Sequence, residues 1–456
     1  MIRNTPVEMH DVIVIGAGPA GSAAAIQLAR AGHDVLMVDR AEFPRFRIGE
    51  SLLPHTQRII RELGLLDRIA DLPHVEKRGL EITFGDLTHE PTAIPFDVIM
   101  GDREKRTFNI RGELLDKMMS DAAMESGATI RFNESVESID QLAAGDVRLT
   151  LTSGEVRAKW IIDASGPACV LGRHLGHRKL DSRFRNVAYF EHYTGVDRPS
   201  GEFEGYASVA MCREGWFWMI PLDEETTSIG VVIDDSLGRH IPVPAKERLQ
   251  WAIRNCPQMA QRMAKAEGPD TNRVISDFCY TCAPYAGPGY FMVGDASAFI
   301  DPVWSTGVSL GLEGGLHAAR QIDQLLKGKV RESVAIRRHD AWISKHRRLF
   351  MNLISYFYKH SFRELLVAGD GPFEVHRALV TLLAGEVFGG MTWDVKWRWG
   401  LLRALSKLNN YRALHEWVEP HSLLLSGGVD LPAPDAGVIG RWHRKLIAKE
   451  ERWQPS

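Results

Sequence analysis

The chain has 456 residues, which is too long for one ordinary hydrophobic core and predicts two or three packed domains. Its apolar content of 45% and charged content of 25% are typical of a soluble globular protein. The net charge of −3 argues against nucleic acid as a partner. No apolar run reaches the length of a membrane span, and the N-terminus lacks the pattern of a signal peptide. We therefore expect a cytoplasmic protein without a membrane partner.

The cysteines are few and odd in number, five in all, which fits a reducing compartment. Cys279 and Cys282 form a C-x-x-C pair, but no second pair or nearby histidine completes a zinc site. Buried strand positions explain the pair better than a metal or redox centre does. The sequence therefore predicts no metal site.

The N-terminal stretch DVIVIGAGPAGSAAAIQLARAGHDVLMVDR predicts a strand at 12–15, a glycine turn, a helix at about 19–30 and a second strand at 35–38. The turn is a G-x-G-x-x-G motif made by Gly16, Gly18 and Gly21. Its glycines allow a tight turn, close approach of the backbone to a pyrophosphate, and close packing of helix and strand. The start of the helix then faces the phosphates with free N–H groups.

Asp39 ends the second strand, where a carboxylate can accept a hydrogen bond from a ribose hydroxyl. The strand, turn, helix, strand and acid together predict a dinucleotide-binding unit, although the fingerprint alone leaves FAD and NAD open. No second fingerprint is found, so the sequence offers no separate Rossmann unit for NADPH.

Two later strands end in similar polar turns, VRAKWIIDASG at 156–166 and GPGYFMVGDASAFIDP at 287–302. These segments resemble those that close the FAD domain in the aromatic-hydroxylase superfamily of flavoproteins. The resemblance implies an α/β fold with a GxGxxG Rossmann-type FAD domain, a β-sheet substrate domain and an α-helical C-terminal cap. The boundaries that we expect are 8–80, 105–180 and 275–330 for the FAD domain, 181–275 for the β-sheet domain, and 331–456 for the helical region.

A pair of tryptophans stands in the segment WFWMIP at 216–221. On an extended strand, side chains at i and i+2 point to the same face. Trp216 and Trp218 are therefore predicted to form a flat aromatic wall, with Phe217 on the opposite face. By itself such a pair is most often core packing.

Five segments together resemble the flavin-dependent halogenases, and most of all those acting on phenols and pyrroles. They are FPRFRIGESLLP at 43–54, VEKRG at 75–79, NIRGELLD at 109–116, WFWMIP at 216–221 and FIDPVWSTG at 299–307. The resemblance covers about 8–330. Trp304 departs from it, because the family usually has phenylalanine there, and the 85–105 region is short. Both departures bear on substrate size.

The resemblance implies roles for named residues. Besides the three glycines and Asp39, those implied to bind the cofactor are Arg47, Glu50, Ser51, Arg111, Asp163, Gly294, Asp295, Pro302 and Gly307. Those implied to take part in catalysis are Lys77, Trp216, Trp218 and Ser305. A halide needs a small pocket of donors, which backbone N–H groups at a turn can form, here those of Thr306, Gly307 and Val308.

The chemistry of the family explains these roles. Reduced flavin and O₂ give a C4a-hydroperoxide, which oxidises chloride or bromide to hypohalous acid. The tryptophan wall keeps the flavin from handing oxygen directly to the substrate. Lys77 holds the hypohalous acid as an ammonium or becomes a haloamine. Without the resemblance, a lysine in a mixed-charge run such as HVEKRGLE is expected to be solvated.

The implied function is FADH₂-dependent halogenation of an electron-rich aromatic, pyrrole- or phenol-like, in secondary metabolism such as antibiotic biosynthesis. The implied partners are a separate flavin reductase and a small aromatic substrate, free or borne by an acyl or peptidyl carrier protein. The alternative is an FAD-dependent monooxygenase, hydroxylase or prenyl reductase of the same fold. A non-enzymatic FAD-binding protein is a third hypothesis.

The C-terminal region is expected to be helical. It contains seven of the twelve tryptophans, at positions 342, 393, 397, 399, 417, 442 and 453. Trp393 and Trp397 lie at i and i+4 on one predicted helix face, a spacing that favours core packing over a substrate cage.

Overall fold

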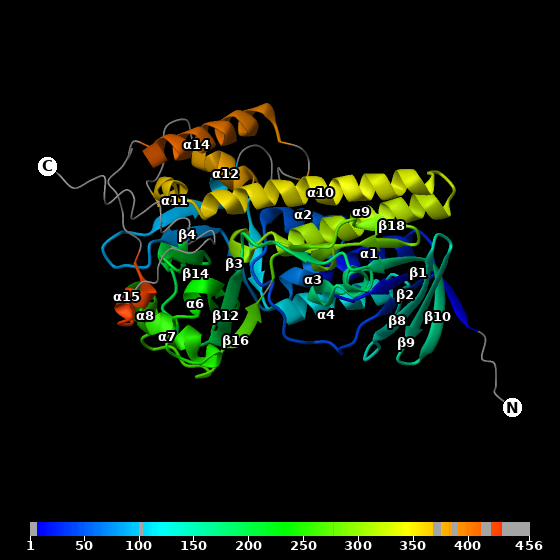
Figure 1. Cartoon of the computed structure of the whole chain (residues 1–456), viewed down its shortest axis with the longest axis horizontal. Coiled ribbons are helices and arrows are strands. Elements are labelled where there is room, and N and C mark those ends of the chain that lie inside the picture. Colours follow the sequence, from blue (N-terminus) through cyan, green and yellow to red (C-terminus); the bar gives the residue numbers. More distant parts are fainter. Residues whose placement is uncertain are drawn as a thin grey trace. The chain divides into compact units, whose positions relative to one another are not determined.

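The computed structural model describes residues 7–99, 104–276, 278–367, 375–382, 384, 388, 391–411 and 421–430 (Figure 1). The chain forms two compact units. Unit 1 comprises Met1–Leu72, Arg111–Leu180 and Tyr280–Phe350, and unit 2 comprises Pro73–Ile110, Asp181–Cys279 and Met351–Ser456. Among the helices described, none is long and apolar enough to cross a membrane.

Unit 1 is built on a sheet with the strand order β18-β19-β10-β1-β2-β7. Its central strands β19, β10, β1, β2 and β7 run parallel, whereas β8 and β9 form a hairpin that extends β10 antiparallel. The bounds are β1 Glu8–Ile15, β2 Val35–Val38, β7 Thr129–Arg131, β8 Val136–Ala143, β9 Asp146–Leu151, β10 Gly154–Asp163, β18 Ala286–Gly287 and β19 Tyr290–Met292.

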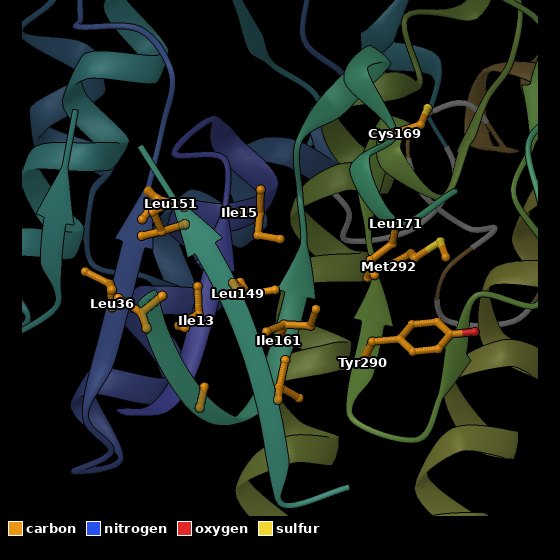
Figure 2. Close-up of a cluster of buried hydrophobic side chains, with 14 of the residues drawn as sticks. Ile13, Ile15, Leu36, Leu149, Leu151, Ile161, Cys169, Leu171, Tyr290 and Met292 are labelled. Carbon is orange, nitrogen blue, oxygen red and sulfur yellow. The ribbon is translucent and has the colours of Figure 1, made fainter. Parts of the chain in front are cut away.

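The main helices of unit 1 are α1 (Pro19–Arg30), α4 (Gly112–Glu125) and α9 (Gly307–Leu326). Helix α1 contacts strands β1 and β2, and helices α4 and α9 pack against α1. Helices α1 and α9 lie side by side (Figure 1), so close that a Cβ on Gly315 would stand 2.2 Å from the Ala20 carbonyl oxygen. Figure 2 shows part of the core, with side chains from β1, β2, β9, β10 and β19. The predicted strands and helix of the N-terminal unit are confirmed.

Shorter elements complete unit 1. They are α2 (Pro54–Glu62), α3 (Leu66–Ala70), α5 (Val170–His174), and a small sheet of β11 (Lys179–Leu180), β17 (Tyr280–Thr281) and β20 (Ala298–Phe299).

Unit 2 contains a seven-stranded sheet with the order β16-β12-β15-β14-β13-β4-β5. Strands β12, β15, β14 and β13 are antiparallel neighbours, and β4 joins β13 in parallel. The bounds are β4 Gly79–Thr83, β5 Thr92–Pro95, β12 Asn186–Tyr193, β13 Ala207–Met211, β14 Gly215–Pro221, β15 Thr227–Asp234 and β16 Arg273–Ser276. A separate ribbon pairs β3 (His74–Lys77) with β6 (Thr107–Ile110).

The described part of unit 2 also contains helices, and the α/β fold class predicted from the sequence is confirmed. They are α6 (Asp235–Gly238), α7 (Arg248–Arg254), α8 (Pro257–Arg262), the end of α10 (Glu332–Phe357), α11 (His360–Val367), α12 (Val375–Thr381), α14 (Trp393–Tyr411) and α15 (Leu423–Ser426). The assignment of domains to cofactor and substrate stays a proposal.

The expectation that Trp393 packs in a core is wrong. Trp393 is 78% exposed, although its ring stands 6.4 Å from that of Trp397. Trp393 is the first residue of α14, and the buried stripe of this helix passes through Val395, Trp399 and Leu402 instead. The tryptophans at 417, 442 and 453 lie outside the described residues.

Candidate active site

The three glycines of the first turn in unit 1 serve different purposes. Gly16 has a φ of +103°, and a Cβ there would stand 2.4 Å from the Ala164 carbonyl oxygen. A Cβ on Gly21 would stand 2.0 Å from the Gly16 carbonyl oxygen. Gly18 has an ordinary φ of −69°, and its Cβ would meet only Asp116 Oδ2, at 4.0 Å, among the residues that the structure describes. The chain itself therefore requires Gly16 and Gly21, whereas Gly18 faces open space at the start of α1, as a bound pyrophosphate requires.

Asp39 is fixed at the end of β2. Its Oδ2 accepts hydrogen bonds from the Ala17 backbone N–H at 2.9 Å and from the Arg45 guanidinium at 3.1 Å. Its Oδ1 accepts from the Ala41 backbone N–H at 3.0 Å. This buried carboxylate is held beside the glycine turn, as its predicted ribose contact requires. The sequence analysis did not identify Arg45 as a site residue. The only indication was its position in the segment FPRFR.

Two carboxylates, those of Asp116 and Asp295, feel the charge of Arg47. Burial raises the pKa of Asp116, on α4, to about 7, and the charges of Arg45 and Arg47 oppose that rise. Burial likewise raises the pKa of Asp295 to about 6, again opposed by Arg47. The Arg47 guanidinium also lies 3.5 Å from where a Cβ on Gly166 would stand. Sequence reasoning missed Asp116, although it lies in the segment NIRGELLD that carries Arg111.

Asp163 stabilises its own turn. Its Oδ1 accepts from the Ser165 backbone N–H at 3.0 Å and its Oδ2 from the Leu171 backbone N–H at 2.7 Å. Burial raises the pKa of this carboxyl, and the same hydrogen bonds oppose the rise. Its predicted contact with the cofactor is therefore best understood as indirect, through the shape of the turn. Arg111 precedes α4 and lies 4.0 Å from the Glu113 carboxylate.

The segment from Pro302 to Val308 turns sharply into α9. Pro302–Trp304 form a 3₁₀ turn, Ser305 follows with a left-handed φ of +54°, and α9 begins at Gly307. The backbone N–H groups of Gly307 and Val308 thus lie in the first turn of α9, which has no internal partner for them. A Cβ on Gly307 would meet nothing within 4 Å among the described residues. This geometry suits the predicted halide site.

The 43–54 segment lies beside this turn. A Cβ on Gly49 would stand 3.3 Å from Val308 Cγ2, and the hydroxyls of Thr56 and Ser309 are 2.6 Å apart. Glu50 and Ser51 are both buried.

Two buried hydroxyls test whether the site fits a cofactor. Ser51 Oγ and Thr306 Oγ1 have no hydrogen-bond partner in the part of the chain that the structure describes. A buried hydroxyl is seldom left unsatisfied in a native protein. FAD and a halide would complete these two hydroxyls and fill the open space at Gly18 and Gly307. They would also meet the first-turn N–H groups of two helices, which have no partner within the helix. The residues of unit 1 therefore fit FAD.

Lys77 lies in unit 2, at the end of β3, where it pairs with Thr107 of β6. It is 0% exposed, and its Nζ lies 5.4 Å from the centroid of the Phe96 ring. Burial lowers the pKa of this amine from 10.5 to about 7. The expectation that a lysine in this charged run is solvated is therefore wrong, because strand pairing and Phe96 bury it. A buried amine with a near-neutral pKa is typical of a functional site.

The two tryptophans lie on one face of β14, with ring centroids 6.0 Å apart, as the strand pattern predicts. Trp216 Nε1 donates to the Tyr358 hydroxyl at 3.1 Å, and Trp218 Nε1 donates to Ser228 Oγ at 3.1 Å. Phe217 is fully buried and, together with Met219, lines a small cavity of about 10 Å³. Both indoles are thus buried and hydrogen-bonded inside unit 2.

No group of three or more potential metal ligands occurs among the residues described. Cys279 and Cys282 are both buried.

The burial of Lys77 has a measurable consequence for stability. Between pH 7 and pH 10.5 the unfolded chain binds more protons at this residue than the folded chain, so stability rises with pH. Below pH 7 Lys77 is charged in both states, and the folded protein bears the full free-energy cost of burying that charge. The Lys77→Met variant buries no charge there, so its free energy of unfolding at neutral pH should be higher, by on the order of 4 kcal/mol at most.

Urea unfolding of the two proteins without cofactor, at pH 7, 8 and 9, measures this difference. The advantage of methionine should shrink by about 1.4 kcal/mol per pH unit. An advantage that does not change with pH would mean that Lys77 keeps an ordinary pKa.

The fold and the open glycine turn define a flavoprotein that binds FAD through a Rossmann-type unit. Residues 9–341 match the family described as "FAD binding domain". A 1H-pyrrole-2-carbonyl-[peptidyl-carrier protein] brominase of Pseudoalteromonas luteoviolacea is 30% identical over 356 residues, covering 76% of this chain and 86% of that protein. The chain belongs to the FAD-binding domain family and, within it, to the flavin-dependent halogenases, which are oxidoreductases.

Further comparisons agree. A tryptophan 2-halogenase of Chondromyces crocatus is 30% identical over 363 residues, covering 77% of this chain and 68% of that protein. The solved structure of a flavin-dependent brominase superposes with a TM-score of 0.77 at 27% identity, over 89% of this chain and 100% of that one.

Proposed function

We propose that this halogenase acts on a pyrrole- or phenol-like ring and that Lys77 delivers the electrophilic halogen. The observation that carries the proposal is the burial of Lys77, with its pKa near 7, in the unit that also carries the Trp216–Trp218 pair. The match to a brominase of carrier-bound pyrrole supports the ring class.

FAD, when bound and reduced, supplies with O₂ the oxidising power that converts chloride or bromide to hypohalous acid. The residues proposed to hold it are the Gly16–Gly18–Gly21 turn, Asp39, Arg47, Glu50, Ser51, Arg111, Gly294, Asp295 and Pro302. The open N–H groups at the start of α9, from Thr306 to Val308, are proposed to bind the halide beside the left-handed turn at Ser305.

Lys77 suits its proposed role because a pKa near 7 populates both protonation states at neutral pH. As an ammonium it donates a hydrogen bond to hypohalous acid. As an amine it displaces water from hypohalous acid to form an N–X bond, and the ring then takes X⁺ and loses its own proton. In either case the lysine acts after the halide has been oxidised.

Trp216 and Trp218 are proposed to block direct oxygen transfer to the ring. Both indoles are buried and hydrogen-bonded, which supports the proposal of a fixed barrier. A separate flavin reductase is proposed as partner, because the sequence contains one dinucleotide fingerprint.

The experiment supplies FAD, a flavin reductase, NADH, O₂ and bromide, and compares three substrates. These are a pyrrole-2-carbonyl group on a carrier protein, a free phenol, and free tryptophan, the last because one relative is a tryptophan halogenase. We expect halogenated pyrrole or phenol. Halogenation of tryptophan alone would contradict the proposed ring class.

A further inference from the structure

Trp216 takes its hydrogen-bond acceptor from the C-terminal part of the chain. The Tyr358 hydroxyl accepts from Trp216 Nε1 at 3.1 Å and from Asn186 Nδ2 at 2.8 Å. All three side chains are buried, with exposures of 3% for Trp216, 4% for Asn186 and 3% for Tyr358. In this setting the hydroxyl fixes the direction of the indole N–H, because a buried donor pays the full desolvation cost when its acceptor is lost.

Further contacts hold Tyr358 itself in place. The ring of Phe357 meets Trp216 edge-on at 6.2 Å and 83°, and the ring of Phe184 lies 5.8 Å from that of Tyr358. Arg363, fully buried, donates to the Phe357 carbonyl oxygen at 2.8 Å and to the Cys212 carbonyl oxygen at 3.2 Å. The end of α10 is thereby tied to the hairpin that leads into β14.

Trp218 is held differently. Its N–H donates to Ser228 on the neighbouring strand, and its ring lies against Gly230, where a Cβ would stand 2.2 Å from Trp218 Cζ2. The ring of Phe190, also in the sheet, lies 5.9 Å away. The described contacts of Trp218 thus come from its own sheet, whereas Trp216 also contacts Tyr358, 142 residues further along the chain.

We infer that Tyr358 and Asn186 are positioning residues that fix the Trp216 indole, so that the end of α10 sets how completely halide oxidation is coupled to ring halogenation. The inference rests on the proposed function of the tryptophan pair. Tyr358→Phe removes one oxygen atom and keeps the ring packing, but it leaves the indole N–H and the Asn186 amide without this acceptor. The barrier then loses its fixed orientation while unit 2 keeps its fold.

The test uses Tyr358→Phe and a matched control, Tyr285→Phe. Tyr285 is a buried tyrosine of unit 1 whose hydroxyl lies 2.7 Å from Thr281 Oγ1, so the same atom and one comparable hydrogen bond are lost. Two quantities are measured: halogenated product per NADH consumed, and the ¹⁹F NMR spectrum of protein labelled with 5-fluorotryptophan. The Trp216 resonance is assigned from its absence in Trp216→Phe.

We expect Tyr358→Phe to shift the Trp216 resonance and to lower the product yield per NADH by about fivefold or more, as for one lost buried hydrogen bond. Asn186→Ala should change both in the same direction but less, and Tyr285→Phe should change neither. An unshifted resonance, or an unchanged yield with a shifted resonance, would overturn the inference. If Tyr358→Phe fails to fold, Asn186→Ala decides by the same two criteria.

A failure of the proposed function would give other results than a failure of the inference about Tyr358. If the parent protein halogenates no ring, or if Trp216→Phe halogenates with unchanged yield, the role of the tryptophan pair is wrong. The NMR result on Tyr358 and Asn186 still stands in that case.

Discussion

Replacing Lys77 by alanine is expected to lower halogenation of the substrate by at least about 100-fold, the usual contribution of a proton-transferring or nucleophilic side chain. FAD binding and O₂ consumption should stay close to those of the parent protein, because the lysine acts after halide oxidation. Halogenated product is measured by mass spectrometry, and NADH and O₂ consumption are recorded in the same reaction.

Two controls make this result specific. Lys77→Arg should not restore activity, because a guanidinium stays protonated and cannot form a comparable haloamine. Lys105→Ala removes an exposed lysine of the same unit and should leave halogenation unchanged. Full halogenation by Lys77→Ala would reduce Lys77 to a buried structural residue.

Replacing Gly18 by valine is expected to abolish FAD binding while the protein still folds. The φ of −69° suits any residue, and an added Cβ would meet no described atom closer than Asp116 Oδ2, at 4.0 Å. The same side chain occupies the place where the pyrophosphate must approach the backbone. Fluorescence titration with FAD and a thermal melt of the apoprotein measure the two effects.

The neighbouring glycine provides the contrast. Gly16→Val combines a φ of +103° with a Cβ only 2.4 Å from a carbonyl oxygen, so it should destabilise the fold itself, by about 1–3 kcal/mol or more. If Gly18→Val binds FAD normally, the glycine turn is not the pyrophosphate site. If it unfolds as Gly16→Val does, Gly18 does not face open space.

Local features of the fold could be predicted from the sequence. The helix at 19–30 and the strand at 35–38 match the structure, and the strand predicted at 12–15 is the second half of β1, which begins at Glu8. Hydrophobic runs and glycines determine these elements within a few residues. The shared face of Trp216 and Trp218 follows in the same way from the two-residue period of a strand.

Features that depend on distant segments could not be predicted. The burial of Lys77 could not be predicted from its charged neighbours, because it depends on β6 and Phe96. His55 Nε2 lies 2.7 Å from Glu313 Oε1 on α9, a contact across 258 residues that no local pattern indicates. Nothing in the aromatic stretch around Tyr358 indicates that this residue contacts Trp216. Trp393 and Trp397 do lie on one helix, as predicted, but Trp393 is exposed to solvent. The helix period alone does not tell which face of a helix meets the core.

The most direct test of the central claim is the mass of the product that the parent protein forms from an electron-rich ring. The reaction contains FAD, a flavin reductase, NADH, O₂ and either bromide or chloride. Halogenation through Lys77 predicts that one ring hydrogen is replaced by the halide supplied, seen as its isotope pattern, and that the product disappears when halide is left out. A product that gains one oxygen atom, whether or not halide is present, would contradict it and would make this protein a hydroxylase.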